Sequence, residues 1–351
     1  MSAQESKVSS ELDGFIVIDK PKGPTSHQVD YWVRQILGIE KVGHIGTLDP
    51  GVTGVLVMAL GKATKLIDIA HEQKKEYVCV MRLYGDVSED SLRNAFHEYE
   101  GEIYQLPPMR AAVARTLRKR TIYKLDILEI SGRLVLFKVV CDSGTYIRTL
   151  CTDVGYSLGV GAQMAELRRT KTGLFQESDL VTLQDIADAK KLSDGGSPEK
   201  LRQLIFSMDY LFRDHSKIIV KKSSLANISR GSDLFPGGIR AVIGTPAKGE
   251  RVAVISENNE LVGTGIMLVN FDEIRDLKVV DFDRVLLENP GQLKQKQKEA
   301  RKEPARKPVV TKFNQNRDRR ERPQFNRQRQ NQRSGGKDVR RREFGNQKRR
   351  R

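Results

Sequence analysis

The chain has 351 residues, of which 38% are apolar, so it is long enough for two globular domains that each bury a core. Its formal net charge is +16, but 23 of the 61 basic residues and only six of the 45 acidic residues lie at positions 291–351, so the remaining body is close to neutral. No apolar run approaches the length of a membrane span, and the polar N-terminus lacks a signal-peptide core, which argues against a membrane role and favours the cytosol.

The C-terminal segment 288–351 is rich in Arg, Lys, Gln and Asn and has almost no apolar periodicity. Such a composition cannot bury enough surface to fold alone, so we expect disorder there and in the polar leader 1–10. The excess positive charge predicts an arm that binds a polyanion such as RNA, although a solubilising tail has the same composition.

The first strand pattern is FIVID at 15–19, and the Pro- and Gly-rich stretch after it ends in Thr25 and Ser26, which are good helix N-caps. From His27 the apolar residues follow helical spacing. Gly38 is a natural stop, so the sequence predicts strand, loop and helix in succession.

The stretch HIGTLDPGVTGVL, 44–56, places one acid, Asp49, among turn residues directly before a buried-strand candidate at 55–60. Its glycines and proline predict a loop with unusual backbone angles at the edge of a core. A carboxylate held in this way is either a turn-former or a catalyst, and the loop pattern by itself leaves both open.

Further along, EYVCVMRLYG at 76–85 alternates in a way that predicts a central, nearly buried strand carrying Tyr77. A later strand ends at Cys141, and after a Ser-Gly turn the apolar spacing predicts a helix whose first turn carries Tyr146 and Arg148. From about position 214 to 280, short strand patterns separated by turns predict a small all-β barrel appended to an α/β body.

The three cysteines fall in apolar segments without zinc-site spacing, and the five histidines do not cluster with them. We therefore expect no metal site and no disulfide framework. The GTG at 263–265 is no dinucleotide fingerprint, because no helical pattern follows it.

Five stretches occur in a fixed order: KPKGPTSHQV, GHIGTLDPGVTGVL, KEYVCVMRLYG, SGTYIRTL and GAQMAELRRT. In this order and at these separations they resemble the TruB-type pseudouridine synthases, specifically the dyskerin-like branch that supplies the catalytic subunit of H/ACA guide ribonucleoproteins in archaea and eukaryotes. The segment 105–123 is also similar to that branch, since it runs directly from PP to RTIY. The resemblance covers roughly residues 11–285 and leaves out the basic tail.

The resemblance implies an α/β (α+β) catalytic domain with a mixed, largely antiparallel sheet at 11–212 and a small all-β PUA pseudobarrel at 213–287. It implies an isomerase that acts on the T-loop uridine of tRNA, on rRNA directed by an H/ACA guide RNA, or on both. It also implies small accessory H/ACA ribonucleoprotein subunits as partners. The short leader favours an archaeal source, and hence the cytoplasm, whereas a eukaryotic member would be nucleolar.

Matched position by position, the resemblance implies that Asp49 is the essential aspartate, that Arg148 pairs with it, and that Tyr77 stacks on the target base. The matched substrate-binding residues are His44, which would wedge near the flipped nucleotide, Tyr146 beside the arginine, and Leu167 in the base pocket. In isolation, Tyr77 and Leu167 would be an ordinary strand aromatic and a core leucine.

The chemistry fits this set of residues. Pseudouridine forms when the N1–C1′ bond breaks, the uracil rotates and a C5–C1′ bond forms, so neither redox step nor cofactor is required. A single carboxylate can serve as nucleophile or as base, and residue identity does not decide between them. The target nucleotide must be flipped out of stacked RNA into a pocket with an aromatic face and an apolar wall.

Two other functions are compatible with parts of the sequence. A non-catalytic RNA scaffold or chaperone in ribosome biogenesis would keep the fold, but it has no need of a loop-mounted acid paired with arginine. A nucleoside hydrolase would usually employ two carboxylates, and no second acid stands out in these motifs.

Overall fold

The computed structural model describes residues 12–107, 114–275 and 277–287. The leader 1–10 and the tail 288–351, for which we expect disorder, lie outside the described residues. The strands of the first sheet are β1 (Gly14–Lys20), β2 (Val42–Ile45), β3 (Thr53–Leu60), β4 (Lys75–Leu83), β5 (Gly101–Gln105), β6 (Arg118–Ser131), β7 (Leu134–Cys141), β8 (Ala162–Thr172) and β9 (Phe175–Gln176).

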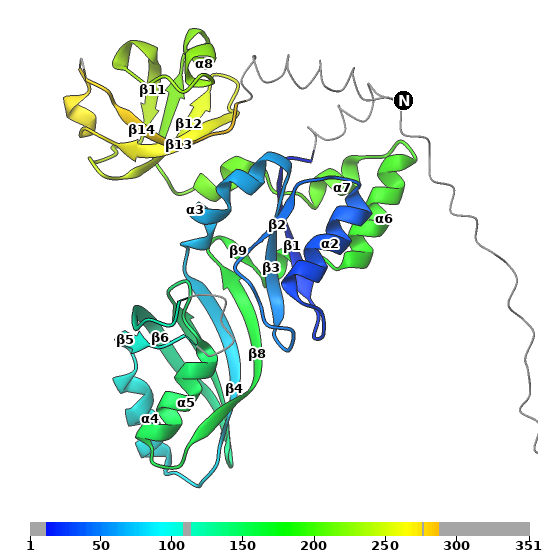
Figure 1. Cartoon of the computed structure of the whole chain (residues 1–351), viewed down its shortest axis with the longest axis vertical. Coiled ribbons are helices and arrows are strands. Elements are labelled where there is room, and N and C mark those ends of the chain that lie inside the picture. Colours follow the sequence, from blue (N-terminus) through cyan, green and yellow to red (C-terminus); the bar gives the residue numbers. More distant parts are fainter. Residues whose placement is uncertain (1–11, 108–113, 276, 288–351) are drawn as a thin grey trace, which may run out of the picture. The chain divides into compact units, whose positions relative to one another are not determined.

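These strands form one sheet in the order β1-β3-β8-β4-β7-β6-β5, with β2 added on β3 and β9 on β8 (Figure 1). The β3–β8 pair is parallel and the other pairs along this path are antiparallel. The expected mixed, largely antiparallel sheet is confirmed. Strand β8 lies near its centre and joins the elements before residue 61 to those after residue 74.

Helices lie against this sheet and connect its strands. They are α2 (Ser26–Leu37), α3 (Ile67–His71), α4 (Glu89–Glu98), α5 (Ile147–Ser157), α6 (Leu183–Asp194) and α7 (Glu199–Gln203), with short 3-10 helices η1 (Gly61–Leu66), η2 (Glu177–Asp179) and η3 (Met208–Phe212). The predicted helix after Thr25 is confirmed: the Thr25 side chain caps Gln28 in a capping box, and Gly38 ends the helix with a left-handed φ of 67°.

The burial of strand β3 explains why its sequence is apolar at every position from 55 to 60. All six of these residues are fully buried because both faces of the strand are covered. Alternate side chains enter different clusters: Val55, Val57 and Ala59 pack in one, and Leu56, Met58 and Leu60 pack in the other. The loop that precedes β3 is therefore anchored to a strand that cannot shift its register without exposing one of these sets.

A second, five-stranded sheet follows in the order β11-β10-β12-β13-β14, with β10 parallel to β12 and the other pairs antiparallel. Its elements are β10 (Lys217–Val220), α8 (Lys222–Ile228), η4 (Pro236–Gly238), β11 (Ile239–Ile243), β12 (Arg251–Ser256), β13 (Leu261–Met267), η5 (Phe271–Glu273) and β14 (Val280–Val285). The GTG motif lies in β13, where a Cβ on Gly263 or Gly265 would come within 2.5 Å or 2.3 Å of a β14 carbonyl oxygen. These glycines thus serve close strand packing.

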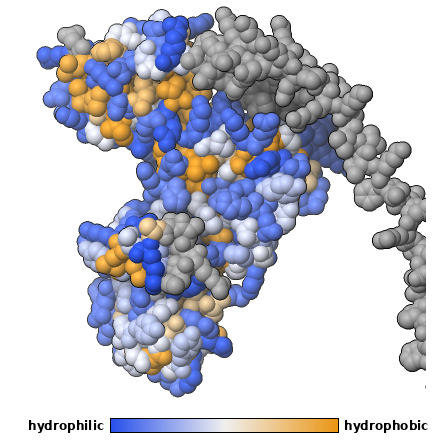
Figure 2. Space-filling model, in the orientation of Figure 1, coloured by the Kyte–Doolittle hydropathy of each residue, from blue (hydrophilic) through white to orange (hydrophobic). Residues whose placement is uncertain are grey.

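The face drawn in Figure 2 is predominantly hydrophilic. Some of its apolar patches lie on the part of the molecule that contains β11–β14. Exposed apolar side chains of that part include Phe235, Ile243 and Leu277. Within the ranges that the structure describes, none of the helices has the length and hydropathy to cross a membrane.

Candidate active site

Asp49 lies in the turn between β2 and β3, and the backbone on both sides of it is tied down. On the N-terminal side, the Ser26 hydroxyl accepts from the Leu48 amide at 2.9 Å and donates to the Leu48 carbonyl at 3.1 Å. On the C-terminal side, the buried Lys20 ammonium donates to the Val52 carbonyl at 2.9 Å. The carboxylate thus projects from a loop whose position is fixed by β1 and α2.

A buried arginine holds the same loop from β8. Arg169 is 1% exposed, and its guanidinium donates to the Gly46 carbonyl at 2.9 Å and to the Val55 carbonyl at 2.7 Å. Gly46 has a left-handed φ of 77°, and a Cβ there would lie 3.2 Å from the guanidinium. Glycine is therefore the residue that suits this position.

Arg148, at the start of α5, donates from Nη2 to the Asp49 carboxylate. Their side chains are 52% and 56% exposed, so water reaches the pair in the free protein. The helix start is fixed by the buried Gln105 of β5, whose side chain accepts from the Tyr146 amide at 2.9 Å and donates to the Tyr146 carbonyl at 3.1 Å. These two hydrogen bonds fix the backbone two residues before Arg148, the residue that contacts Asp49.

Tyr77 and Leu167 are brought to the same place by neighbouring strands, because β4 pairs with β8. Both side chains are half-buried and pack against the apolar cluster that contains Leu48 and Val52, the residues flanking the Asp49 turn. Burial raises the pKa of the Tyr77 hydroxyl, and the adjacent Arg169 opposes that rise. The arrangement sets an aromatic ring and an aliphatic side chain beside the loop that carries the acid.

His44 lies on β2 with its ring fixed at both nitrogens: Nδ1 is 2.7 Å from an Asp30 carboxylate oxygen of α2, and Nε2 is 3.0 Å from the Thr47 hydroxyl. Within the described part of the chain, neither a hydrogen bond nor an ion pair joins His44 or Tyr146 to Asp49. The structure therefore brings Asp49 and Arg148 into direct contact, whereas His44 and Tyr146 bond to other residues.

One group of side chains has donor atoms close enough to hold a metal ion. These are His27, Asp30 and His44, whose candidate ligand atoms lie within 4.8 Å of one another. The Asp30–His44 hydrogen bond already uses two of these atoms, and the His27 side chain is 83% exposed. The simplest function of Asp30 is to orient His44, and the expectation that no metal takes part stays a prediction.

Three family matches cover most of the described chain. "TruB family pseudouridylate synthase (N terminal domain)" matches residues 34–147, "tRNA pseudouridylate synthase B C-terminal domain" matches 148–213, and "PUA domain" matches 216–286. The "Probable tRNA pseudouridine synthase B" of Picrophilus torridus is 60% identical over 279 residues, which are 80% of this chain and 80% of that protein. The chain belongs to the TruB family of pseudouridine synthases.

Other relatives agree with this assignment. The protein of the same name from Thermoplasma acidophilum is 60% identical over 80% of this chain and 76% of its own length. The chain in "Crystal Structure of a Cbf5-Nop10-Gar1 Complex" is 42% identical with a TM-score of 0.73, over 80% of this chain and 86% of that one. The chain in "Structure of H/ACA RNP bound to a substrate RNA containing 2'-deoxyuridine" is 39% identical with a TM-score of 0.72, over 82% and 88%.

These matches confirm the family resemblance, the two-part α+β and PUA fold, and the isomerase class expected for a TruB-type pseudouridine synthase. Sequence reasoning did not find several residues that build this site: Lys20, Ser26, Gln105 and Arg169. Lys20 and Arg169 carry charges that are usually exposed, so their burial gives no signal in one sequence. For Lys20, its place in the KPKGPTS motif before the loop was the available indication.

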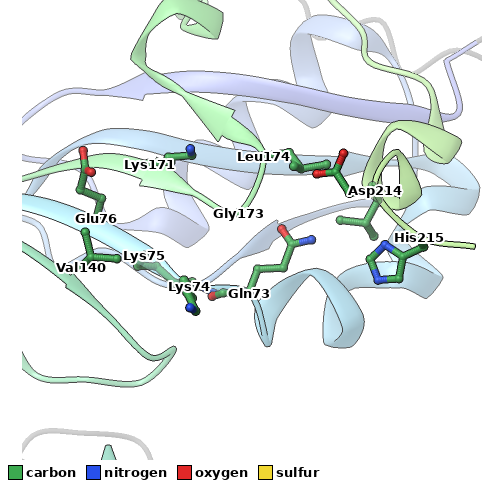
Figure 3. A pocket seen from close by; sticks show the side chains of 11 residues that line it. Gln73, Lys74, Lys75, Glu76, Val140, Lys171, Gly173, Leu174, Asp214 and His215 are labelled. Carbon is green, nitrogen blue, oxygen red and sulfur yellow. The ribbon is translucent and has the colours of Figure 1, made fainter. Parts of the chain in front are cut away.

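One cavity of about 490 Å³ lies away from the Asp49 turn, at the start of β4, where its basic lining residues include Lys75, Lys171 and His215 (Figure 3). None of the six residues that the resemblance singles out lines it. The Asp49 and Arg148 side chains of this TruB-family protein are instead exposed, as suits a substrate as large as RNA.

Proposed function

We propose that this TruB-family pseudouridine synthase uses Asp49 as its catalytic carboxylate on uridines in RNA. The observation that supports this is the contact between Asp49 and Arg148 on a loop held from β1, α2 and β8. Arg148 donates a charge-assisted hydrogen bond that orients the carboxylate. Tyr77 and Leu167, half-buried beside the same loop, offer the aromatic face and apolar wall that a flipped base needs.

The isomerisation balances without an added reagent. The N1–C1′ bond breaks, the uracil turns, a C5–C1′ bond forms, the C5 proton leaves and N1 regains a proton. Asp49 acts either as nucleophile or as base in this sequence. Bound RNA would cover the exposed Asp49–Arg148 pair and remove water, which strengthens the interaction and protects the intermediate.

We propose the T-loop uridine of tRNA, or rRNA uridines selected by an H/ACA guide RNA, as the substrates. The curated relatives are named for tRNA, one of the matched solved structures is a Cbf5-Nop10-Gar1 complex, and another is an H/ACA RNP bound to a substrate RNA. Small accessory subunits of that kind are the proposed protein partners. The relatives come from archaea, so we place the protein in an archaeal cytoplasm.

The remaining proposals concern organisation. Residues 11–212 would form the catalytic domain and 213–287 the PUA domain, which would grip the RNA away from the target base. His44, oriented by Asp30, would contact the flipped nucleotide, and Tyr146 would line the substrate side of Arg148.

Replacement of Asp49 by asparagine tests the catalytic role, because it removes the charge and keeps the shape. We expect D49N to abolish tritium release from RNA labelled at uridine C5, while its affinity for that RNA stays within a few-fold of wild type, since phosphate and shape contacts dominate binding. Retained activity would exclude Asp49 as the catalyst. Loss of both activity and RNA binding would instead indicate that the D49N protein does not fold correctly.

The same release assay separates the two substrate modes. A tRNA transcript is incubated with the protein alone, and a guide RNA with accessory subunits is then added to a parallel sample containing an rRNA target. Release from tRNA alone supports guide-independent action. Release that requires the guide supports the ribonucleoprotein mode.

A further inference from the structure

Two buried cations, Lys75 and Arg169, converge with the exposed His71 behind the Asp49 loop, and we call these three residues the basic cluster. Their geometry is clearest at Gly46: a Cβ there would lie 3.2 Å from Arg169 Nη1, 3.8 Å from His71 Cδ2 and 3.8 Å from Lys75 Cε. Arg169 and Lys75 are only 1% and 3% exposed. The cluster therefore lies directly beneath the loop.

The cluster lacks the partners that usually accompany buried charge. Of the ion pairs formed by the described residues, none includes Arg169 or Lys75. Lys75 donates to the backbone carbonyls of His71 and Gln73 instead. Burial of a cation without an anion is costly, and an apolar side chain of similar size would avoid that cost. A specific function for Arg169 would explain why a charge is kept there.

Arg169 holds the acid-bearing loop from a position next to Tyr77. Its guanidinium donates to the Gly46 carbonyl, three residues before Asp49, and to the Val55 carbonyl in the strand that follows the loop. In the antiparallel β4–β8 pair, Arg169 is the register partner of Tyr77. One rigid, planar group thus ties the loop that carries the acid to the strand position opposite the residue proposed to hold the base.

We propose that Arg169 is a positioning residue for the isomerisation: by holding the Asp49 loop from the strand position opposite Tyr77, it fixes the distance between the Asp49 carboxylate and the Tyr77 ring. This inference rests on the proposed roles of Asp49 and Tyr77. A shift of about 1 Å in reacting groups can lower a rate about 100-fold, so such a clamp affects turnover more than affinity. Lysine cannot replace it, because an ammonium lacks the planar fork that reaches several acceptors.

Replacement of Arg169 by lysine tests the clamp, and Arg168→Lys is the matched control on the same strand. Arg168 is more exposed and pairs with Asp19 and Glu177 rather than with the loop. With saturating RNA, we expect the single-turnover rate of R169K to fall about 10- to 100-fold, with RNA affinity within about threefold of wild type. R168K should keep its rate within about twofold, although its thermal midpoint falls.

A double-mutant cycle with Gly46→Ala separates positioning from general destabilisation. If Arg169 acts through the loop, R169K should slow the reaction much less in the G46A background than in wild type. Equal losses in both backgrounds, or a folded R169K at full rate, would overturn the proposal. D49N is assayed in parallel: an active D49N refutes the proposed function itself, whereas an inactive D49N with a fully active R169K refutes only the clamp.

If circular dichroism shows that R169K does not fold, Gly46→Ala provides the test instead. This change crowds the guanidinium from the side of the loop and strains the left-handed φ of Gly46, while the side chains of the basic cluster are not replaced. A rate loss of at least about tenfold with unchanged RNA affinity supports the clamp. Full activity of G46A with native thermal behaviour overturns it.

Discussion

The Lys75 ammonium shows how the charge near this site is controlled. Burial, followed by the neighbouring Arg169, lowers the pKa of Lys75 from 10.5 to about 7. Between those two values the unfolded chain binds more protons than the folded chain, so the contribution of Lys75 to stability improves as pH rises. Below about 7 both states are protonated and the full cost of the buried charge remains.

This linkage can be measured with Lys75→Met. Urea titrations at a series of pH values measure the unfolding free energy of both proteins. Between about pH 7 and 10, we expect the unfolding free energy of wild type to rise relative to that of K75M by at most about 1.4 kcal/mol per pH unit. The exposed Lys171, replaced in the same way, should give a curve parallel to wild type. Parallel curves for K75M as well would mean that Lys75 keeps an ordinary pKa in the folded state.

At the scale of single residues, the sequence identified the groups that its motifs make visible. Asp49, Arg148, Tyr77 and Leu167 stand in ordered stretches, and the structure brings the first two into contact. The buried supports could not be predicted, because the partners of Arg169 are backbone carbonyls contributed by a loop and a strand more than 110 residues earlier. A pattern of residue types does not encode such a contact.

At the scale of elements, the starting position of helix α5 depends on a residue of strand β5. Gln105 of β5 bonds both backbone groups of Tyr146, two residues before Arg148. No side-chain hydrogen bond caps this helix, and the two Gln105 bonds instead fix the backbone of Tyr146 at the N-cap position. They link the end of β5 to the arginine that contacts Asp49.

Replacement of Gln105 by alanine should therefore weaken both stability and catalysis. We expect a loss of about 1–3 kcal/mol in unfolding free energy, because buried backbone groups lose their partners, together with a slower single-turnover rate. Gln184→Ala on α6, whose side chain bonds only the exposed Asp188, is the control and should change neither quantity measurably. A destabilised Q105A with an unaltered rate would show that Gln105 does not position Arg148.

The helices and strands themselves could be predicted from local sequence patterns, whereas the pairing of the strands could not. Helix α2 carries its own start and stop signals at Thr25 and Gly38, and the apolar run of β3 marks a strand covered on both faces. The parallel pairing of Thr53 with Arg168 joins segments 115 residues apart, and single-sequence periodicity holds no information on that partner. The family resemblance supplied the topology instead.

At the scale of the whole molecule, charge is divided between a near-neutral body and a basic C-terminal segment. We propose that this segment adds phosphate contacts to those of the folded domains. Truncation after residue 290 removes 23 basic residues, so it should weaken RNA binding and flatten the plot of log affinity against log salt concentration. Filter binding at several salt concentrations measures both, and the choice of uridine should not change. An unchanged slope would leave the segment without a role in RNA binding.

The parallel pairing of β3 with β8 has a consequence for the order of events during synthesis. Asp49 leaves the ribosome more than 100 residues before Arg169, yet its loop is held in part by that arginine. Strand β1 likewise forms isolated bridges with residues 181 and 206. A nascent chain that ends before β8 therefore lacks one of the groups that hold the Asp49 loop, so the candidate active site can be completed only after residue 169 has been synthesised.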